Sequence, residues 1–286
     1  MQRQYPVEER PLSPRDYDMP VGWWGWNWEP PVPMSVTELL EAGNFDARTA
    51  ALCWMVLEAH GSLLISAEEP HSGKTTTLTA FLDFIPAGVR GIFIRGWSET
   101  FDYLQQTDPE RTLLLANELS SHLPVYLWGP KAVRVFSTLQ QGYAFASTLH
   151  ADSASEAVTQ LRDELGVAEA DLAQVDLLAV MRLYETSRGE PARRVVSLHR
   201  VRGLIPLVEW DQGADEHLHH DDAQLELLGD RTGRPLEDLR ADLARRAEFL
   251  ESLVARGVRA IPAVHRAFTT FRSEAVPIRQ QAEAAS

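Results

Sequence analysis

The most specific chemical signal in this sequence is the run Ser72-Gly73-Lys74-Thr75-Thr76. It follows an apolar stretch and opens a helical pattern, which is the context that a phosphate-binding loop requires. Glycine permits close approach of the backbone, and the N–H groups at a helix N-terminus bind anionic oxygens. Lys74 would reach the β and γ phosphates, and the Thr75 hydroxyl would hold Mg²⁺. We therefore expect these five residues to bind ATP with Mg²⁺; an inherited but empty loop is the alternative.

The upstream half of this loop departs from the usual phosphate-loop motif. Glu68 occupies the position of the motif's first glycine, and Pro70 and His71 follow it. The glutamate adds negative charge where phosphates would lie, and the proline lacks an N–H donor. A positive φ at Glu68 would add backbone strain. We expect a weaker affinity than that of an intact loop, partly offset if His71 is protonated; an exposed His71 without a role is the alternative.

The elements predicted around this loop alternate between strands and helices. Apolar runs of strand length are separated by segments with helical periodicity, which indicates a mostly parallel α/β sheet. Two further runs, 177–186 and 192–201, are expected to form a hairpin. The other expected strands are 62–67, 91–95, 112–116 and 144–149, and the expected helices are 36–42, 46–60, 73–84, 131–139 and 153–165.

The sequence pattern changes near residue 205. A short strand-like stretch, 204–210, is followed by an acidic loop and then by helices, of which 235–255 has the clearest apolar stripe. We therefore place a domain boundary near residue 205. At the other end, residues 1–34 are rich in Trp and Pro. Those tryptophans would form either a docking surface for a partner or a segment packed on the rest of the chain.

The acidic loop contains three histidines, His217, His219 and His220, beside Asp221 and Asp222. Imidazole and carboxylate groups are good metal ligands, so a metal site is one interpretation of this cluster. The spacing matches no specific type of site. A solvent-exposed loop without a metal is the alternative that we favour.

The composition limits the class of protein. The chain has 286 residues, a formal net charge of −14 and a single cysteine, Cys53. A nucleic-acid-binding surface would be basic, and one cysteine cannot form an intramolecular disulfide. The longest apolar run, 50–57, is too short to span a bilayer, and the first residues lack the apolar stretch of a signal peptide. We expect a cytoplasmic protein without a transmembrane segment that does not bind nucleic acid.

Several segments resemble, in the same order, parts of the type II/IV secretion ATPases and type IV pilus ATPases, especially their archaeal-type members. Ser35-Val-Thr-Glu-Leu-Leu is similar to the entry into the motor core, and Ser72-Gly-Lys-Thr-Thr-Thr-Leu is similar to the Walker A region. Gly142-Tyr-Ala-Phe-Ala-Ser-Thr-Leu-His-Ala-Asp-Ser resembles the His box, with His150 at the box histidine. The resemblance covers roughly residues 25–272.

This resemblance implies an α/β fold with a RecA-like P-loop NTPase core and a small C-terminal helical domain. The chain then divides into a Trp/Pro-rich N-terminal segment (1–34), a RecA-like nucleotide-binding domain (35–205) and a mostly helical domain (206–286). The family forms hexameric rings. The implied partners are therefore copies of this chain or a paralogous secretion ATPase, and a membrane platform protein of a pilus or secretion system. The implied location is the cytoplasm or the inner face of the membrane.

The resemblance also implies catalytic residues. Glu118 falls where the family has its catalytic glutamate, which could polarise the attacking water. His150 would sense the nucleotide. Glu99 is the candidate for the acidic box, although Arg95 inverts the charge at the expected position. A solvated Glu118 at a strand end and a structural, hydrogen-bonded His150 are the alternatives. The family's N-terminal domain, which supplies arginines to the nucleotide, is not found ahead of the core.

The expected function is that of an ATP-binding subunit, or paralogue, of a type IV pilus or secretion motor. Two versions stay open. Lys74, Thr75, Glu118 and His150 favour an active, truncated secretion ATPase. The altered loop and acidic box favour a non-hydrolysing scaffold or regulator that joins a ring with a full-length paralogue. An unrelated P-loop kinase or DNA translocase is disfavoured by the order of the segments and by the acidic charge.

Overall fold

The computed structural model describes residues 33–185 and 189–283, with side chains described as far as residue 274. These residues form an eight-stranded sheet with the order β2-β3-β4-β1-β5-β6-β7-β8. β2, β3, β4, β1 and β5 run parallel, and β6, β7 and β8 continue the sheet antiparallel. The strands are β1 (Leu63–Ser66), β2 (Arg90–Phe93), β3 (Thr112–Leu115), β4 (Ala144–Leu149), β5 (Leu177–Glu185), β6 (Pro191–Arg200), β7 (Ile205–Asp211) and β8 (Glu216–His219).

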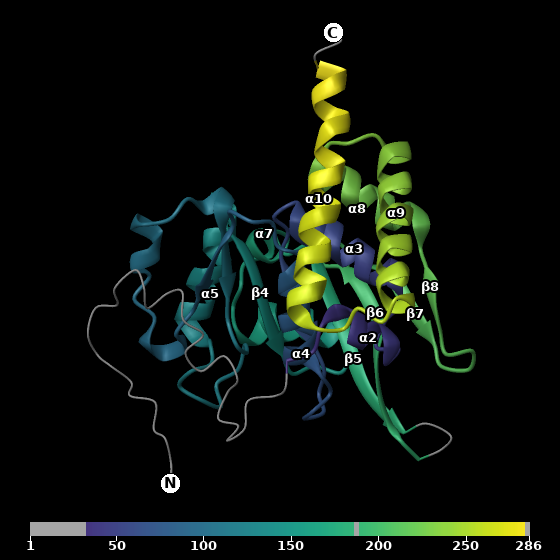
Figure 1. Ribbon diagram of the computed structural model, residues 1–286. Helices are drawn as coiled ribbons and strands as arrows, with labels where there is room; N and C mark the ends of the chain where they lie inside the picture. Colours follow the sequence, from purple (N-terminus) through teal and green to yellow (C-terminus); the bar gives the residue numbers. More distant parts are fainter. Residues whose placement is uncertain (1–32, 186–188, 284–286) are drawn as a thin grey trace.

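Helices cover both faces of this sheet (Figure 1). Successive side chains of a strand point to opposite faces, so β1 contributes Leu63 and Ile65 to one core and Leu64 to the other. The first core includes residues of α3, α4, α9 and α10, and the second includes residues of α5 and α6. The helices are α2 (Val36–Glu41), α3 (Ala47–Glu58), α4 (Lys74–Phe81), α5 (Gly129–Thr138), α6 (Ala154–Thr159), α7 (Glu169–Leu172), α8 (Asp221–Thr232), α9 (Leu236–Ala255) and α10 (Ile261–Glu283).

The strand that precedes the phosphate loop, β1, lies between β4 and β5. Its residues are buried, as expected for a parallel strand that is covered on both faces, and its sequence is accordingly apolar nearly throughout. Parallel strands end at the same edge of a sheet. The loop after β1 therefore lies beside the end of β4, where the Ala67 N–H donates to the Leu149 carbonyl at 3.3 Å. The segment after β3 joins the same edge, since the Leu119 N–H donates to the Thr148 carbonyl at 2.7 Å.

The C-terminal helices pack on α3. The side chain of Trp54 in α3 is fully buried, and its ring centroid lies 4.5 Å from that of Phe268 in α10 and 5.9 Å from that of Phe249 in α9. The Arg246 guanidinium of α9 lies 4.4 Å above the Trp54 ring. Large aromatic side chains bury much apolar area, so this cluster joins α9 and α10 to the first core.

The predicted α/β fold with a mostly parallel sheet is confirmed, and so is the hairpin, which β5 and β6 form. The expected loop after residue 210 is wrong in part, because residues 216–219 form β8, which pairs with β7. The strand went unrecognised because an exposed edge strand has no apolar run. β7 and β8 also continue the sheet past residue 205, so the division into domains at that residue stays a prediction. The Trp/Pro-rich segment lies almost wholly outside the described residues.

Candidate functional site

The phosphate loop connects β1 to α4 and folds around Lys74. The Lys74 side chain is buried, and its Nζ donates to the Ala67 carbonyl at 2.8 Å. Gly73 has a φ of 94°, in the left-handed region that glycine adopts without strain. His71 also has a positive φ, of 61°, whereas Glu68 does not and is exposed to solvent. The backbone strain considered for Glu68 therefore falls on His71.

Burial determines the electrostatics of Lys74. It lowers the pKa of the ammonium group, and the carboxylates of Glu118, Glu68 and Glu69 act in the opposite direction. A buried ammonium group costs free energy unless a negative charge compensates it. The nearest compensating groups come from the loop and from the segment after β3. An anionic ligand in this loop would supply further compensation.

Three hydroxyl groups around the loop are buried without a hydrogen-bond partner among the described residues: those of Ser66, Ser72 and Thr77. Of the three, the Ser72 hydroxyl is the strongest indication of a missing ligand, because it lies within the motif and is only 1% exposed. A buried polar group without a partner costs about 1–3 kcal/mol, so such groups usually have one. Phosphate oxygens would provide it. These hydroxyls, the buried Lys74 and the start of α4 fit a phosphorylated ligand, and the half-buried Thr75 fits the Mg²⁺ that accompanies a nucleotide.

Glu118 and His150 form a titratable pair beside the loop. The His150 Nε2 lies 3.4 Å from the Glu118 carboxylate, and its Nδ1 lies 3.1 Å from the Glu68 carbonyl. A carbonyl only accepts, so Nδ1 carries a hydrogen. The hydrogen bond with Glu118 raises the pKa of His150, against opposing effects of burial and of Lys74. The fold thus brings Lys74, Glu118 and His150 together, as expected; their catalytic roles stay a prediction.

Glu99 occupies a different setting, in the loop after β2. Its side chain is buried, and its two carboxylate oxygens accept the backbone N–H groups of Arg95, at 3.1 Å, and Phe101, at 2.6 Å. Burial raises the pKa of Glu99. Among the described residues, no hydrogen bond or ion pair joins Glu99 to Lys74 or Glu118. Its role in the acidic box stays a prediction, and its present contacts stabilise its own loop.

The structure also places Arg193 of β6 at the phosphate loop. The Arg193 Nε donates to the His71 carbonyl at 2.8 Å. A Cβ atom built on Gly73 would lie 3.1 Å from the Arg193 Cδ. Nothing in the sequence pattern singles out this arginine. The hairpin that carries it was predicted, but the pairing of β5 with β1, which brings the hairpin to the loop, depends on the sheet order.

The three histidines considered as possible metal ligands contact three different partners. His217 contacts the Val195 carbonyl, His219 contacts the Asp46 carboxylate and His220 contacts the Glu209 carboxylate. His217 and His219 lie two positions apart in β8 and so share one face of the sheet, whereas His220 follows the strand. In the part of the chain that the structure describes, no group of three or more His, Cys, Asp or Glu side chains is placed to hold a metal ion. Nor does any described helix combine the length and apolarity needed to cross a bilayer.

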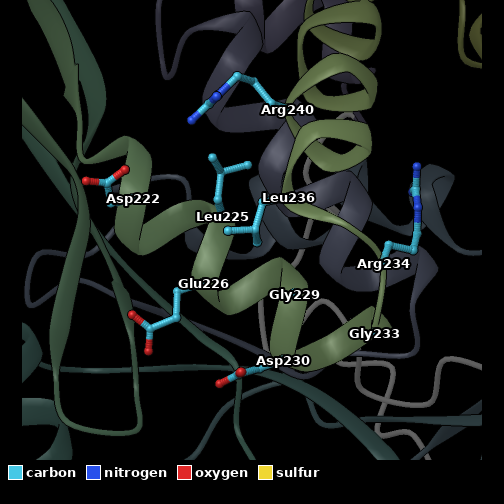
Figure 2. A pocket seen from close by; sticks show the side chains of 9 residues that line it. All are labelled: Asp222, Leu225, Glu226, Gly229, Asp230, Gly233, Arg234, Leu236 and Arg240. Atoms are coloured by element: carbon cyan, nitrogen blue, oxygen red, sulfur yellow. The ribbon is translucent and has the colours of Figure 1, made fainter.

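A groove lies between α8 and α9. Figure 2 shows Leu225 and Leu236 pointing toward one another there, with acidic side chains along α8. Three of the charged side chains that line it have partners: Glu226 and Asp230 pair with Arg200, and Arg234 pairs with Asp242. None of its lining residues belongs to the phosphate loop. The groove therefore offers less specific chemistry than the loop does.

No family model matches this chain. Two curated relatives are uncharacterized proteins of Methanocaldococcus jannaschii. The first is 26% identical over 259 residues, which cover 79% of this chain and 47% of the relative. The second is 25% identical over 252 residues, which cover 76% of this chain and 90% of the relative. The chain thus spans about half the length of the first relative and most of the second.

Solved structures with a similar arrangement include three ATPases. The Legionella pneumophila ATPase DotB has a TM-score of 0.45 and 10% identity, over 76% of this chain and 58% of that chain. The VirB11 ATPase of the Brucella suis type IV secretion system in complex with sulphate has a TM-score of 0.41 and 17% identity, over 58% of this chain and 55% of that chain. The Yersinia pseudotuberculosis ATPase DotB has a TM-score of 0.39 and 14% identity, over 84% of this chain and 63% of that chain. Likeness at this level is too distant to assign a function, which must be argued from the phosphate loop itself.

Proposed function

We propose that this chain binds ATP with Mg²⁺ at the phosphate loop and acts as an ATP-binding subunit of a ring-forming motor of the secretion or pilus type. The observation that carries the proposal is the buried Lys74 ammonium at the start of α4, together with the buried Ser72 hydroxyl of the same motif, which has no hydrogen-bond partner among the described residues. The order of family-like segments along the sequence supports the motor class. Copies of this chain or a full-length paralogue would complete the ring, at the cytoplasmic face of a membrane platform protein.

In this proposal each residue has a defined task. Lys74 and the N–H groups at the start of α4 neutralise phosphate charge, and Ser72 donates its hydroxyl hydrogen to a phosphate oxygen. Thr75 contributes its hydroxyl to Mg²⁺, which would polarise the phosphate oxygens when bound. Glu118, oriented by His150 at 3.4 Å, accepts a proton from water. Protonation of His150 would weaken this basicity and add positive charge.

The test is an equilibrium titration with a fluorescent ATP analogue, with Mg²⁺ and with a chelator. Lys74→Ala should weaken binding at least about tenfold, because the ammonium group is the central phosphate ligand. The matched control is Lys131→Ala. Lys131 is the second of the two lysines, and it donates to the Trp97 and Glu99 carbonyls rather than to the phosphate loop. If the wild type and Lys74→Ala bind the analogue equally well, the proposal is wrong.

A non-hydrolysing subunit is the second candidate, and the setting of Glu99 favours it. Its carboxylate oxygens already accept two backbone N–H groups, and its pKa is raised by burial, so it is poorly prepared to bind a metal ion. Phosphate release should be measured for the isolated chain and for its mixture with a full-length secretion ATPase from the same source. We expect little turnover by the isolated chain. Robust turnover that Glu118→Gln abolishes would instead identify a self-sufficient motor.

A further inference from the structure

Arg193 contacts the phosphate loop at its most strained point. Its Nε donates to the carbonyl of His71, which has a left-handed φ of 61°. Its aliphatic stem passes Gly73, where an added Cβ would lie 3.1 Å from Cδ. A left-handed conformation costs a non-glycine residue about 1–2 kcal/mol and persists only where its surroundings hold it. Arg193 is therefore one of the groups that hold the loop in shape.

The loop also needs positive charge. Glu68, Glu69 and Glu118 all lie close enough to act on the pKa of Lys74. A nucleotide would add several further negative charges at this point, and Lys74 alone cannot balance them. Close like charges repel by about 1 kcal/mol or more at 4 Å, even in water. A second cation at the loop would reduce this repulsion.

Arg193 carries such a positive charge, and among the described residues no carboxylate pairs with it. No carboxylate of residues 33–185 or 189–274 forms an ion pair with it, and its described hydrogen bond uses only Nε. The adjacent Arg194 differs: its Nε and Nη2 donate to both carboxylate oxygens of Asp215, and its Nη1 donates to the Ala42 carbonyl. A guanidinium group stays charged and matches phosphate oxygens in geometry.

We propose that Arg193 is the second cation of the nucleotide site, supplied by the β5–β6 hairpin of the same chain: it holds the loop through His71 and compensates the charge of the phosphates. This inference rests on the proposed function. It gives the chain an arginine at the phosphates without one from a separate domain. Since the effect is electrostatic, it should grow with the charge of the ligand, from ADP to ATP.

The hairpin itself offers a matched control. Arg182 of β5 pairs across the sheet with Arg194, while Arg193 pairs with Leu183, so Arg182 and Arg193 belong to opposite faces. Arg182 is exposed. Arg182→Gln therefore removes the same charge from the same hairpin without removing a contact to the phosphate loop. Arg193→Lys is the second useful variant, because it keeps the charge but loses the guanidinium geometry.

The experiment titrates fluorescent ATP and ADP analogues against the wild type, Arg193→Gln, Arg193→Lys, Arg182→Gln and Lys74→Ala, at low and high salt. Thermal unfolding confirms that each variant is folded. We expect Arg193→Gln to weaken binding of the ATP analogue about tenfold and of the ADP analogue less, with a smaller loss at high salt. Arg193→Lys should recover part of the loss, and Arg182→Gln should resemble the wild type.

Equal affinities of wild type and Arg193→Gln would overturn the inference, and so would equal losses in Arg193→Gln and Arg182→Gln. A loss that is the same for ATP and ADP, and that lysine does not reduce, would assign Arg193 to loop shape alone and would also overturn the charge role. Failure of the proposed function looks different, since the wild type would then bind no better than Lys74→Ala. Binding that depends on Lys74 but not on Arg193 would remove this inference only.

Discussion

At the scale of single residues, the site combines one buried ammonium group with one titratable pair. His150 reaches Glu118 through Nε2 and the Glu68 carbonyl through Nδ1. Because Nδ1 is already committed to a carbonyl, a second hydrogen on Nε2 improves the contact with the Glu118 carboxylate. This is the physical reason for the raised pKa of His150. The protonation state of His150 therefore affects both the stability of the protein and the charge beside Lys74.

The first prediction is a dependence of stability on pH that passes through His150. A histidine with a raised pKa stabilises the fold fully below its usual value of 6.5, and this contribution is lost as the pH rises through the raised value. The wild type should lose about 1 kcal/mol or less between about pH 6 and pH 8.5 relative to His150→Gln. Urea unfolding of both proteins at each pH measures the difference. His199 and His217, whose pKa values are lowered, are present in both proteins, so their contributions to the pH dependence cancel in this comparison. Parallel pH profiles of the two proteins would contradict the prediction.

The second prediction concerns Glu68→Gly, which should tighten binding of an ATP analogue. The Glu68 side chain is exposed and its φ is not positive, so the gain comes from charge and not from relief of strain. We expect a gain of about 0.5–1 kcal/mol at low salt, fading at high salt. Glu68→Gln is the control, because it removes the charge and leaves the backbone restricted. If only the glycine variant binds more tightly, backbone freedom is the cause.

At the scale of elements, the start of α3 connects the core of the fold to its edge strand. Asp46 caps α3 by accepting the Thr49 N–H at 2.7 Å, and its second oxygen lies 2.7 Å from the Nε2 of His219 in β8. Burial opposes ionisation of this carboxyl. The hydrogen bonds from His219 and Thr49 outweigh it and lower the pKa of Asp46 to about 2. One side chain thus both begins a helix and holds the last strand of the sheet.

The third prediction is that Asp46→Ala costs about 1–3 kcal/mol of unfolding free energy, since it removes an N-cap and leaves the Nε2 of His219 without its partner. A carboxyl with a lowered pKa stabilises the fold above its unfolded value of 3.8, and this part is lost as the pH falls toward about 2. Urea unfolding at neutral and acidic pH tests both statements. Ser35→Ala, at the capping box of α2, is the control for loss of a cap that has no histidine partner. Equal costs for the two variants would exclude a contribution from His219.

At the scale of the whole molecule, the eight strands form one sheet and the C-terminal helices share a core with α3. Trp54 lies at the centre of that shared core. It contacts aromatic rings of α9 and α10, and the ring of Phe84 lies 5.8 Å from it, centroid to centroid. The residues on the two sides of position 205 therefore depend on one another for burial.

The fourth prediction is that the described part of the chain unfolds in one cooperative transition. Trp54→Ala should lower the unfolding free energy by about 3–5 kcal/mol, because it opens a large cavity between α3, α9 and α10. Thermal unfolding followed by far-UV and near-UV circular dichroism should give coincident curves for the wild type. Two separate transitions, with only one shifted by Trp54→Ala, would instead support independent domains on either side of residue 205.

The sequence by itself determined the features that depend on neighbouring residues. The phosphate loop, the strand before it and the helix after it follow from a local motif and local periodicity. The β5–β6 hairpin follows from two strand-like runs joined by a short turn. β8 was missed because a short, polar edge strand forms only when a neighbouring strand offers hydrogen bonds.

The tertiary structure alone decided which distant side chains meet. The approach of Arg193 to His71 and of His219 to Asp46 joins residues separated by 122 and 173 positions. Such contacts depend on the order of strands in the sheet and on the turn that returns each strand to its neighbour. Neither is encoded in a window of local sequence. The sequence therefore determined where a phosphate could bind, and the sheet order decided which charges surround that place.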